Sequence, residues 1–430
     1  MLPFPSPSGV RAAADLLRRR VVSTPVLESR LLNAELGGGR LLVKAECLQH
    51  TGSFKYRGAL HRLIRLQADD PEAAVRGVVA FSSGNFGQAL AAAATSLGVH
   101  CTIVSPHDAP PLKLERIEKY GARLRTSTAL PNENREVVAS ALAQQLSVEE
   151  GLTLLHPFDD AHVIHGQGTI GMEFLEQAGQ LLSADEAAAA KGLGRAASPP
   201  AEASAMDMIV VPCGGGGMTA GICLSVEDAA LQNRTAVMTV EPTGFDDHAR
   251  SFRASRRLSL AEIYDQGGTA QVPAAPLQPP RSRRGFFPSA SGPAASPPPA
   301  AAARSASSYP IPVPRERSVA CDALMASAPG ALTWSVNGPR LSGAVAVADD
   351  AAVGRAMKVA FDHFRLVLEP SGALALAAVL DGLVPLLEVD RTGNDTKQHD
   401  GVILPPGKVI GIIACGGNTD LHTFSRMTHQ

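Results

Sequence analysis

The chain has 430 residues, of which 45% are hydrophobic and 19% are charged, and its formal net charge is −2. This is the composition of a folded globular protein with enough residues for two or three domains. The near-neutral charge argues against a nucleic-acid partner, and the lack of any apolar run of about 18 residues argues against a membrane partner or span.

Short apolar runs rich in β-branched residues alternate along the chain with Ala- and Leu-rich segments of helical period. The runs predict strands at Leu41–Val43, Gly77–Phe81, Cys101–Val104, Met208–Val211, Val237–Val240 and Val409–Ile413. The other segments predict helices, among them Asn85–Ser96, Asn132–Gln145 and Asp350–Phe364. Alternation of this kind favours an α/β fold, in which a mostly parallel sheet carries helices on both faces and binds ligands at the carboxyl ends of its strands.

Three stretches interrupt this alternation and are predicted to be disordered insertions, at residues 184–205, 266–317 and 389–406. The middle stretch holds 12 of the 32 prolines, all between Pro273 and Pro314, and has no acidic residue between Asp265 and Glu316. Such a composition cannot bury enough apolar area to fold. We interpret it as a solvent-exposed loop, with a regulatory or partner-binding arm as the alternative.

Six cysteines, at positions 47, 101, 213, 223, 321 and 415, include no C-x-x-C pair. This spacing argues against a disulfide framework or a zinc site, and it fits a reducing compartment such as the cytoplasm. We expect most of these cysteines to be small buried hydrophobic residues.

Three clusters carry the residues of chemical interest. A lysine precedes a helix in Thr51-Gly52-Ser53-Phe54-Lys55, and a polar turn follows a strand in Ser82-Ser83-Gly84-Asn85. Four successive glycines, Gly214, Gly215, Gly216 and Gly217, then lie between a strand and a helix, where their backbone N–H groups can converge on an anion. Taken singly, the lysine predicts a solvated cation, the polar turn a helix cap, and the glycine run a flexible linker.

Together and in this order, the clusters resemble the fold-type II pyridoxal-phosphate enzymes, and within them the serine racemase and serine/threonine dehydratase group. Further matches are Thr24–Leu27, His156–Asp160, Gly166–Ile170, Glu369–Ala373 and Cys415–Asn418. The resemblance covers nearly everything outside the insertions.

The resemblance implies a fold like that of the tryptophan synthase β subunit, in which two open twisted sheets enclose pyridoxal 5'-phosphate in a cleft. Residues 1–76 and 155–430 would form the large domain that binds the cofactor, and residues 77–154 the small domain. A homodimer is expected by the same resemblance.

The resemblance also assigns roles to single residues. Lys55 matches the lysine that binds the cofactor covalently and later acts as a base on the substrate α-carbon. Phe54 and Asn85 match positions beside the cofactor ring, and Cys415 matches the position that faces its pyridine nitrogen. The phosphate would lie against Gly214, Gly215, Gly216, Gly217 and the amide of Met218.

Ser83 decides between two reactions. It matches the residue from which serine racemases protonate the α-carbon on the face opposite the lysine, where many dehydratases have alanine. A racemase needs a proton donor on each face, whereas elimination needs a base on one face. The alternatives are that Ser83 merely caps the following helix, or that the chain is a hydroxyaspartate dehydratase, because that group shares the serine.

Other substrate contacts are expected from Ser82, Ser83 and Arg135. Phe86 stands where histidine is common in the group, and Phe158 stands where the animal racemase has asparagine, so both make the pocket less polar. The segment Ser318–Asp322 replaces a T-I-A-D-G pattern and shifts its acidic residue by one position.

Two further sites are implied. Glu241, the carbonyl of Phe245 and Asp247 match a segment that binds Mg²⁺, with Ca²⁺ or Mn²⁺ as other hard cations that oxygen ligands accept. A bland alternative is that these acids form a solvated face. Ser29, Thr51, Gln88, Tyr120 and Asn418 match positions of an allosteric ATP site, although His50 and Arg30 depart from the pattern of that site.

The expected function is a serine racemase that also eliminates water and ammonia from L-serine to give pyruvate. The second expectation is a threonine or 3-hydroxyaspartate ammonia-lyase, and the third is a non-catalytic amino-acid sensor or scaffold. Retention of Lys55 disfavours the third, because a sensor does not need the reactive amine.

Overall fold

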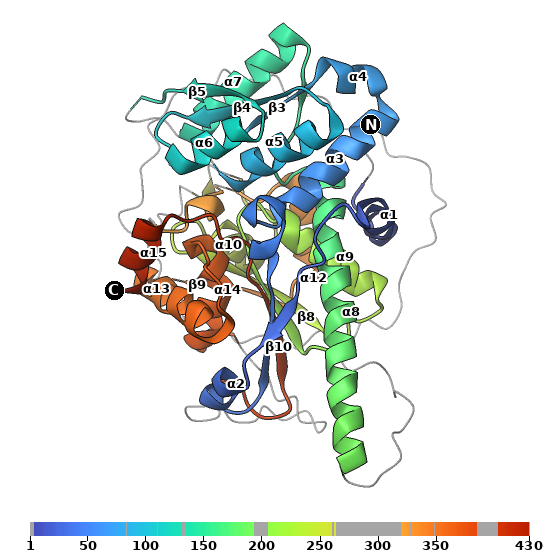
Figure 1. The fold of residues 1–430 in the computed structure, drawn as a ribbon, viewed down its shortest axis with the longest axis vertical. Helices are drawn as coiled ribbons and strands as arrows, with labels where there is room; N and C mark the ends of the chain where they lie inside the picture. The colour runs from blue at the N-terminus through green and yellow to red at the C-terminus, as the bar shows by residue number, and fades with distance from the viewer. Residues whose placement is uncertain are drawn as a thin grey trace.

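The chain folds into two sheets, one mostly parallel and one wholly parallel, each with helices on both faces. One sheet lies above the other along the longest axis of the molecule (Figure 1). The computed structural model describes residues 4–82, 84–109, 111–130, 135–192, 205–259, 262–263, 320–326, 328–347, 349–384 and 403–429. The expected α/β class is confirmed, since the predicted strands at Leu41, Gly77, Cys101, Met208, Val237 and Val409 all form.

The larger sheet has six strands in the order β1-β2-β10-β7-β8-β9. β1 pairs antiparallel with β2, and every other pair in this sheet is parallel. The strands are β1 (Val26–Glu28), β2 (Arg40–Lys44), β7 (Met208–Pro212), β8 (Ala236–Pro242), β9 (Gly343–Val347) and β10 (Val409–Ile413).

The smaller sheet has four parallel strands in the order β5-β4-β3-β6. They are β3 (Val78–Phe81), β4 (Cys101–Pro106), β5 (Arg123–Ser127) and β6 (Thr153–Leu154). All four come from one continuous stretch of the chain, so the smaller sheet is inserted between two segments that build the larger one.

Alternating side chains of each strand enter different cores, as the pleat of a strand requires. Leu41 and Val43 of β2 pack in one core with α13 and α14, whereas Leu42 packs in the other with α8 and α9. The helices of the larger part are α1 (Pro7–Leu17), α2 (Arg30–Leu36), α8 (Ala161–Gly192), α9 (Gly217–Asp228), α10 (Asp247–Arg253), α12 (Ala331–Arg340), α13 (Asp350–Val359), α14 (Pro370–Leu380) and α15 (Leu421–Thr428).

The smaller sheet is covered by helices in the same way. Val78 and Ala80 face a core shared with α3 and α5, and Val79 faces α7 on the other side. These helices are α3 (Lys55–Asp69), α4 (Pro71–Arg76), α5 (Asn85–Leu97), α6 (Pro111–Lys119) and α7 (Arg135–Glu150). Because α3 packs against both α5 and α8, it connects the two halves of the molecule.

Two predicted insertions need correction at their ends. Residues 184–192 were expected to be disordered, but they continue α8 to Gly192, and Figure 1 shows that end of the helix projecting beyond the sheet. The alanine-rich sequence has high helix propensity, which accounts for the extension. Residues 403–406 were expected to be disordered as well, but Leu404 is fully buried, and its amide donates to the carbonyl of Leu36 at 2.8 Å. The insertion at residues 266–317 lies outside the described residues.

All six cysteines are free and buried, as the sequence analysis expects. Among the described residues, no helix has both the length and the apolar character needed to cross a membrane.

Candidate active site

Phe54 and Lys55 lie where the end of β10 meets the start of α3. Ser53 forms an antiparallel bridge with Gly416, and the amide of Phe54 donates to the carbonyl of Cys415 at 3.1 Å. The backbone therefore brings Phe54, Lys55 and Cys415 together, although more than 350 residues of sequence separate the two segments.

The side chain of Lys55 is half-buried, and its amine lies among two aromatic rings and a backbone carbonyl. Its Nζ donates to the carbonyl of Pro157 at 3.2 Å and lies 5.1 Å from the ring centroid of Phe54 and 5.8 Å from that of Phe86. Burial lowers the pKa of Lys55 to about 8, because the charged form is poorly solvated there. Near that pH a large fraction of the amine is neutral, as a nucleophile or a base must be.

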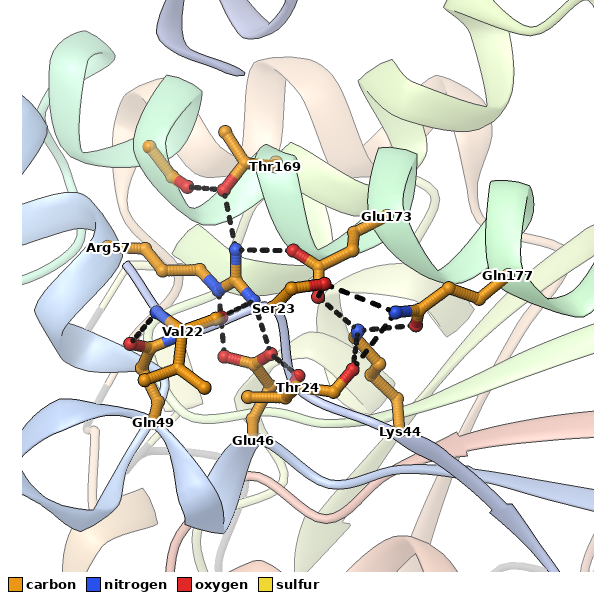
Figure 2. A network of polar contacts seen from close by, with 12 residues as sticks. Val22, Ser23, Thr24, Lys44, Glu46, Gln49, Arg57, Thr169, Glu173 and Gln177 are labelled. Atoms are coloured by element: carbon orange, nitrogen blue, oxygen red, sulfur yellow. Dashed lines mark hydrogen bonds and ion pairs between the residues drawn. The ribbon is translucent and has the colours of Figure 1, made fainter. Parts of the chain in front are cut away.

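A buried ion network holds the first turn of α3 in place (Figure 2). Arg57, two residues after Lys55, donates to both carboxylate oxygens of Glu46 at 2.9 and 2.7 Å and to Glu173 of α8 at 3.1 Å. Lys44 of β2 donates to Glu173 at 2.6 Å, so the network joins β2, α3 and α8. It restrains the position of Lys55 without contacting its amine.

The glycine turn joins β7 to α9. The amide groups of Gly214, Gly215 and Gly216 donate no hydrogen bond to any residue that the structure describes, and all but Gly214 of the four glycines are buried. Gly217 begins a 12-residue helix, whose first amides have no partner within the helix and whose dipole favours an anion there. These orphaned donors fit a phosphate group.

Glycine is required in this turn for two reasons. Gly216 has a φ of +90°, which residues with a side chain rarely adopt, and a Cβ on Gly215 would lie 2.3 Å from the ring of Phe158. Phe158 follows Pro157, the residue that accepts from Lys55. The segment around Phe158 therefore packs against the glycine turn on one side and binds the lysine on the other.

Asn85 is oriented by neighbours on both ends of its amide. Its Nδ2 donates to Glu369 Oε1, and its Oδ1 accepts from Asn418 Nδ2 at 2.9 Å. Asn418 is held in turn by the carbonyl of Thr51 at 2.8 Å and by Arg116 at 2.8 Å. One hydrogen of the Asn85 amide stays available for an acceptor such as a phenolic oxygen.

Glu369 is a site residue that the sequence analysis did not single out. Its side chain is buried at the start of α14, and burial raises its pKa to about 7. Lys113 lies 3.9 Å from it and forms an ion pair at 2.6 Å with Asp322, the shifted acid of the Ser318–Asp322 segment. The Glu-Pro-Ser-Gly motif gave a signal for Glu369, but no local pattern marked Lys113 as its neighbour.

Cys415 presents a neutral thiol. Its Sγ contacts the carbonyl of Ser371 at 3.5 Å, and burial raises its pKa well above the ordinary value. An uncharged thiol facing a pyridine nitrogen does not protonate that nitrogen as a carboxylic acid would.

The residues expected to contact the substrate lie in different elements, and one of them is outside the described residues. Ser82 Oγ accepts from the amides of Gly84 at 3.2 Å and Gly87 at 3.0 Å, so it shapes the turn into α5. Arg135 begins α7 and pairs with Asp108 at 3.2 Å. Ser83 lies outside the described residues, and its role stays a prediction.

The expected metal residues are buried, so the alternative of a solvated acidic face is wrong. Glu241 and Asp247 have exposed fractions of 0% and 1%, and Phe245 is also buried. Both Asp247 oxygens accept no hydrogen bond from any described residue. Burial raises the pKa of both carboxyl groups, that of Glu241 to about 7, in the absence of a cation.

The described contacts do not join the five residues expected to bind ATP into one group. Thr51 and Asn418 are in contact, as described above. Gln88 is fully buried inside α5, and Ser29 caps α2 and contacts His363 Nδ1 at 3.1 Å. Tyr120 lies at the end of α6, where its carbonyl accepts from Thr95 at 2.6 Å.

Comparisons with known proteins agree with this geometry. Residues 17–277 match the model of a family described as pyridoxal-phosphate dependent enzyme. A serine racemase of Arabidopsis thaliana is 30% identical over 412 residues, which are 96% of this chain and 92% of that protein. An L-threo-3-hydroxyaspartate ammonia-lyase of Saccharomyces cerevisiae is 36% identical over 250 residues, 58% of this chain and 66% of that protein. The structure of maize serine racemase aligns with a TM-score of 0.68 at 27% identity and covers 99% of this chain and 98% of its own.

Proposed function

The chain belongs to the pyridoxal-phosphate-dependent enzymes, with the fold-type II architecture, and we propose that it interconverts the enantiomers of serine and eliminates water and ammonia from L-serine. The observation that carries the proposal is the half-buried Lys55 amine, with a pKa of about 8, near a glycine turn whose amides have no described partner. The full-length similarity to serine racemases supports the choice of reaction.

The residues present fit the cofactor, which when bound would withdraw electrons from the substrate α-carbon and so acidify its proton. The amides of the glycine turn and Met218 would hold its phosphate, and Phe54, Asn85 and Cys415 would surround its ring. A neutral Cys415 makes the ring a mild electron acceptor, which suits proton transfer at the α-carbon and suits amino transfer poorly.

Two side chains of this protein would carry out the proton transfer. Lys55 would remove or return the α-proton on one face, since its lowered pKa keeps part of it neutral near pH 8. Ser83 would serve the opposite face. Ser82 and the Thr51–Gly52 backbone would bind the substrate carboxylate, and closure of the 77–154 domain would exclude water.

A threonine or 3-hydroxyaspartate ammonia-lyase is the second candidate. It is favoured by the 36% identity to the yeast ammonia-lyase, which exceeds the 30% identity to the plant racemase but spans a shorter segment. Lys55 alone would suffice as the base in that reaction.

Four accessory features complete the proposal. The resemblance implies Mg²⁺, Ca²⁺ or Mn²⁺ at Glu241, Phe245 and Asp247, and the burial of the two carboxylates supports a cation there. Allosteric ATP, a homodimer and a cytoplasmic location are inferred from the resemblance and, for the location, from the reduced cysteines.

The wild-type protein tests the reaction directly. Purified enzyme is incubated with L-serine, L-threonine and L-threo-3-hydroxyaspartate, and keto acid and D-isomer are followed together. We expect D-serine and pyruvate from L-serine. If the enzyme forms keto acid but no D-serine, it is an ammonia-lyase and the racemase proposal is wrong.

Ser83→Ala separates racemisation from elimination. Loss of the second proton donor should lower D-serine formation at least about 100-fold, whereas elimination from L-serine should persist because it needs only Lys55. Elimination from D-serine should fall together with racemisation. Equal loss of L-serine elimination would make Ser83 a structural or carboxylate-binding residue.

Lys55→Ala should abolish both reactions and the visible absorbance of the covalently bound cofactor. Lys358→Ala is the matched control, because Lys358 is exposed and pairs with Asp362 on the surface. Visible absorbance in the Lys55→Ala variant that borohydride abolishes, with the cofactor then fixed to another lysine, would contradict the assignment.

A further inference from the structure

A cluster of four buried side chains lies beneath the glycine turn. Cys213 directly precedes the turn, Glu241 lies in β8, and Asp247 and His248 belong to α10. Each has an exposed fraction of 1% or less. One donor atom from each of Cys213, Glu241 and His248 lies within 4.8 Å of the other two.

The distances match those between ligands of one tetrahedral ion. His248 Nδ1 lies 3.6 Å from Cys213 Sγ, 3.3 Å from Glu241 Oε1 and 3.4 Å from Asp247 Oδ2. Zinc bonds of about 2.3 Å to sulfur and about 2.0–2.1 Å to nitrogen or oxygen place tetrahedral neighbours about 3.6 Å (S to N) and about 3.3 Å (N to O) apart. A cation can therefore enter with little movement of these side chains.

His248 can pair with both carboxylates of the cluster, but the hydrogen bonds of those carboxylates are incomplete. The Glu241 oxygens accept the amides of His248 at 3.0 Å and Ala249 at 2.8 Å. Both oxygens of Asp247 accept no hydrogen bond among the described residues, although the carboxyl group is fully buried. A buried carboxylate without hydrogen bonds is unfavourable, and a bound cation would remove that cost.

The donor types select a class of cation. Mg²⁺ and Ca²⁺ take oxygen ligands, whereas thiolate and imidazole favour borderline transition metals such as Zn²⁺. The hard-cation expectation drawn from Glu241, Phe245 and Asp247 leaves out the thiol and the imidazole that the fold adds.

We propose that Cys213, Glu241 and His248 are the protein ligands of a Zn²⁺-class cation, with Asp247 supplying a further negative charge beside them. The proposal does not depend on which reaction the enzyme catalyses. It revises the metal expectation and makes Cys213 a ligand, which the lack of a C-x-x-C pair disfavoured.

Asn337 lies where it can form a hydrogen bond with the second ring nitrogen of His248. Histidines that bind a metal through one nitrogen usually donate the other N–H to an acceptor. Asn337 Nδ2 lies 3.3 Å from His248 Nε2, and its Oδ1 has no hydrogen-bond partner among the described residues. A rotation of this amide would place Oδ1 against Nε2–H. Before such a rotation Asn337 Nδ2 donates to the carbonyl of Gly216 at 3.2 Å, a bond that the rotation would give up, and this contact shows that the cation site adjoins the glycine turn.

Two measurements test the proposal, namely the affinity for zinc and the identity of the atoms that bind it. Full-length enzyme, cleared of metal by a chelator, is titrated with Zn²⁺ and separately with Mg²⁺, and X-ray absorption at the zinc edge is recorded. We expect one zinc per chain, with one sulfur at about 2.3 Å and nitrogen or oxygen at about 2.0 Å. Zn²⁺ should raise the melting temperature more than Mg²⁺ does.

Cys213→Ala should remove the sulfur signal and weaken zinc binding at least about 100-fold, because loss of a residue that merely orients a ligand already costs about 10- to 100-fold. Cys101→Ala is the matched control, since Cys101 is buried in β4 of the other sheet.

Two results would overturn the proposal. One is a zinc shell without sulfur together with equal stabilisation by Mg²⁺ in the parent and in Cys213→Ala. The other is no binding of either ion. The measurement on the unsubstituted enzyme decides even if a variant fails to fold.

Discussion

Two of the buried clusters of charged side chains in the described residues differ in how completely their polar atoms are paired. In the network around Arg57, both cations and both carboxylates have at least two described partners, and these join β2, α3 and α8 (Figure 2). In the cluster around Glu241, Asp247 has no hydrogen bond among the described residues.

The difference separates a structural network from a binding site. Buried charges are tolerated when attraction and hydrogen bonds offset their lost hydration, as they do around Arg57. Where the folded chain gives a buried carboxylate no hydrogen bond and only an ionic contact, as Asp247 has with His248 Nδ1 at 3.4 Å, a further partner is expected from outside the chain. Removing one charge should therefore have opposite effects on stability in the two clusters.

Arg57→Met should give the largest effect. It leaves the carboxylates of Glu46 and Glu173 short of their main cation, so we expect the free energy of unfolding to fall by about 3–5 kcal/mol. Arg65→Met on the same helix is the control. Its ion pair with Asp69 is partly exposed, and its loss should cost at most about 1 kcal/mol. Equal losses by urea denaturation would show that the Arg57 network is energetically ordinary.

Asp247→Asn should have the opposite sign in metal-free enzyme. Asp247 accepts no hydrogen bond among the described residues, and the histidine that it contacts, His248, also pairs with Glu241. Removing this buried charge should therefore raise the free energy of unfolding by about 1–2 kcal/mol, and the stabilisation by added Zn²⁺ should shrink. Asp246→Asn is the neighbouring control, because Asp246 pairs with Arg250 at 2.9 Å and its loss should destabilise. If chelated Asp247→Asn is less stable than the parent, the carboxylate is already compensated and the contrast between the clusters fails.

Glu369 is an intermediate case, with one oxygen bonded to Asn85 and the other without a hydrogen-bond partner among the described residues. Burial raises the pKa of Glu369 from 4.5 to about 7, so between these values the folded chain binds more protons than the unfolded chain. The contribution of Glu369 to the free energy of unfolding therefore falls as the pH rises through that window.

Glu369→Gln keeps an oxygen for Asn85 and cannot ionise. Near pH 7.5 we expect it to be more stable than the parent by about 3 kcal/mol, and the difference should vanish near pH 4. Thermal melts of the cofactor-free enzyme across this range measure it. A constant difference at every pH would mean that the carboxyl group does not titrate in the window.

Local patterns were enough to predict the fold class, and the resemblance of the motifs to a known family singled out Lys55. The six predicted strands formed because runs of β-branched residues bounded by turns favour extended structure wherever they are buried. The motifs around Lys55, Asn85 and Gly214–Gly217 also lie in short continuous segments. The sequence therefore indicated the residues of the candidate active site before their arrangement in space was known. The composition rule failed at residues 184–192, where alanine favours helix even in a segment that resembles an insertion.

Contacts between distant segments were decided by tertiary structure alone. Parallel pairing of β7 with β8 sets Pro212 opposite Val240, which places Cys213 beside Glu241 across 28 residues of sequence. Nothing in either segment specifies that register, because it depends on how the whole sheet packs between its two helical layers. The Lys113–Asp322 ion pair likewise requires α6 to face a segment more than 200 residues away. Sequence fixes which donors exist, and the packing of the two sheets determines which donors meet and which remain unpaired.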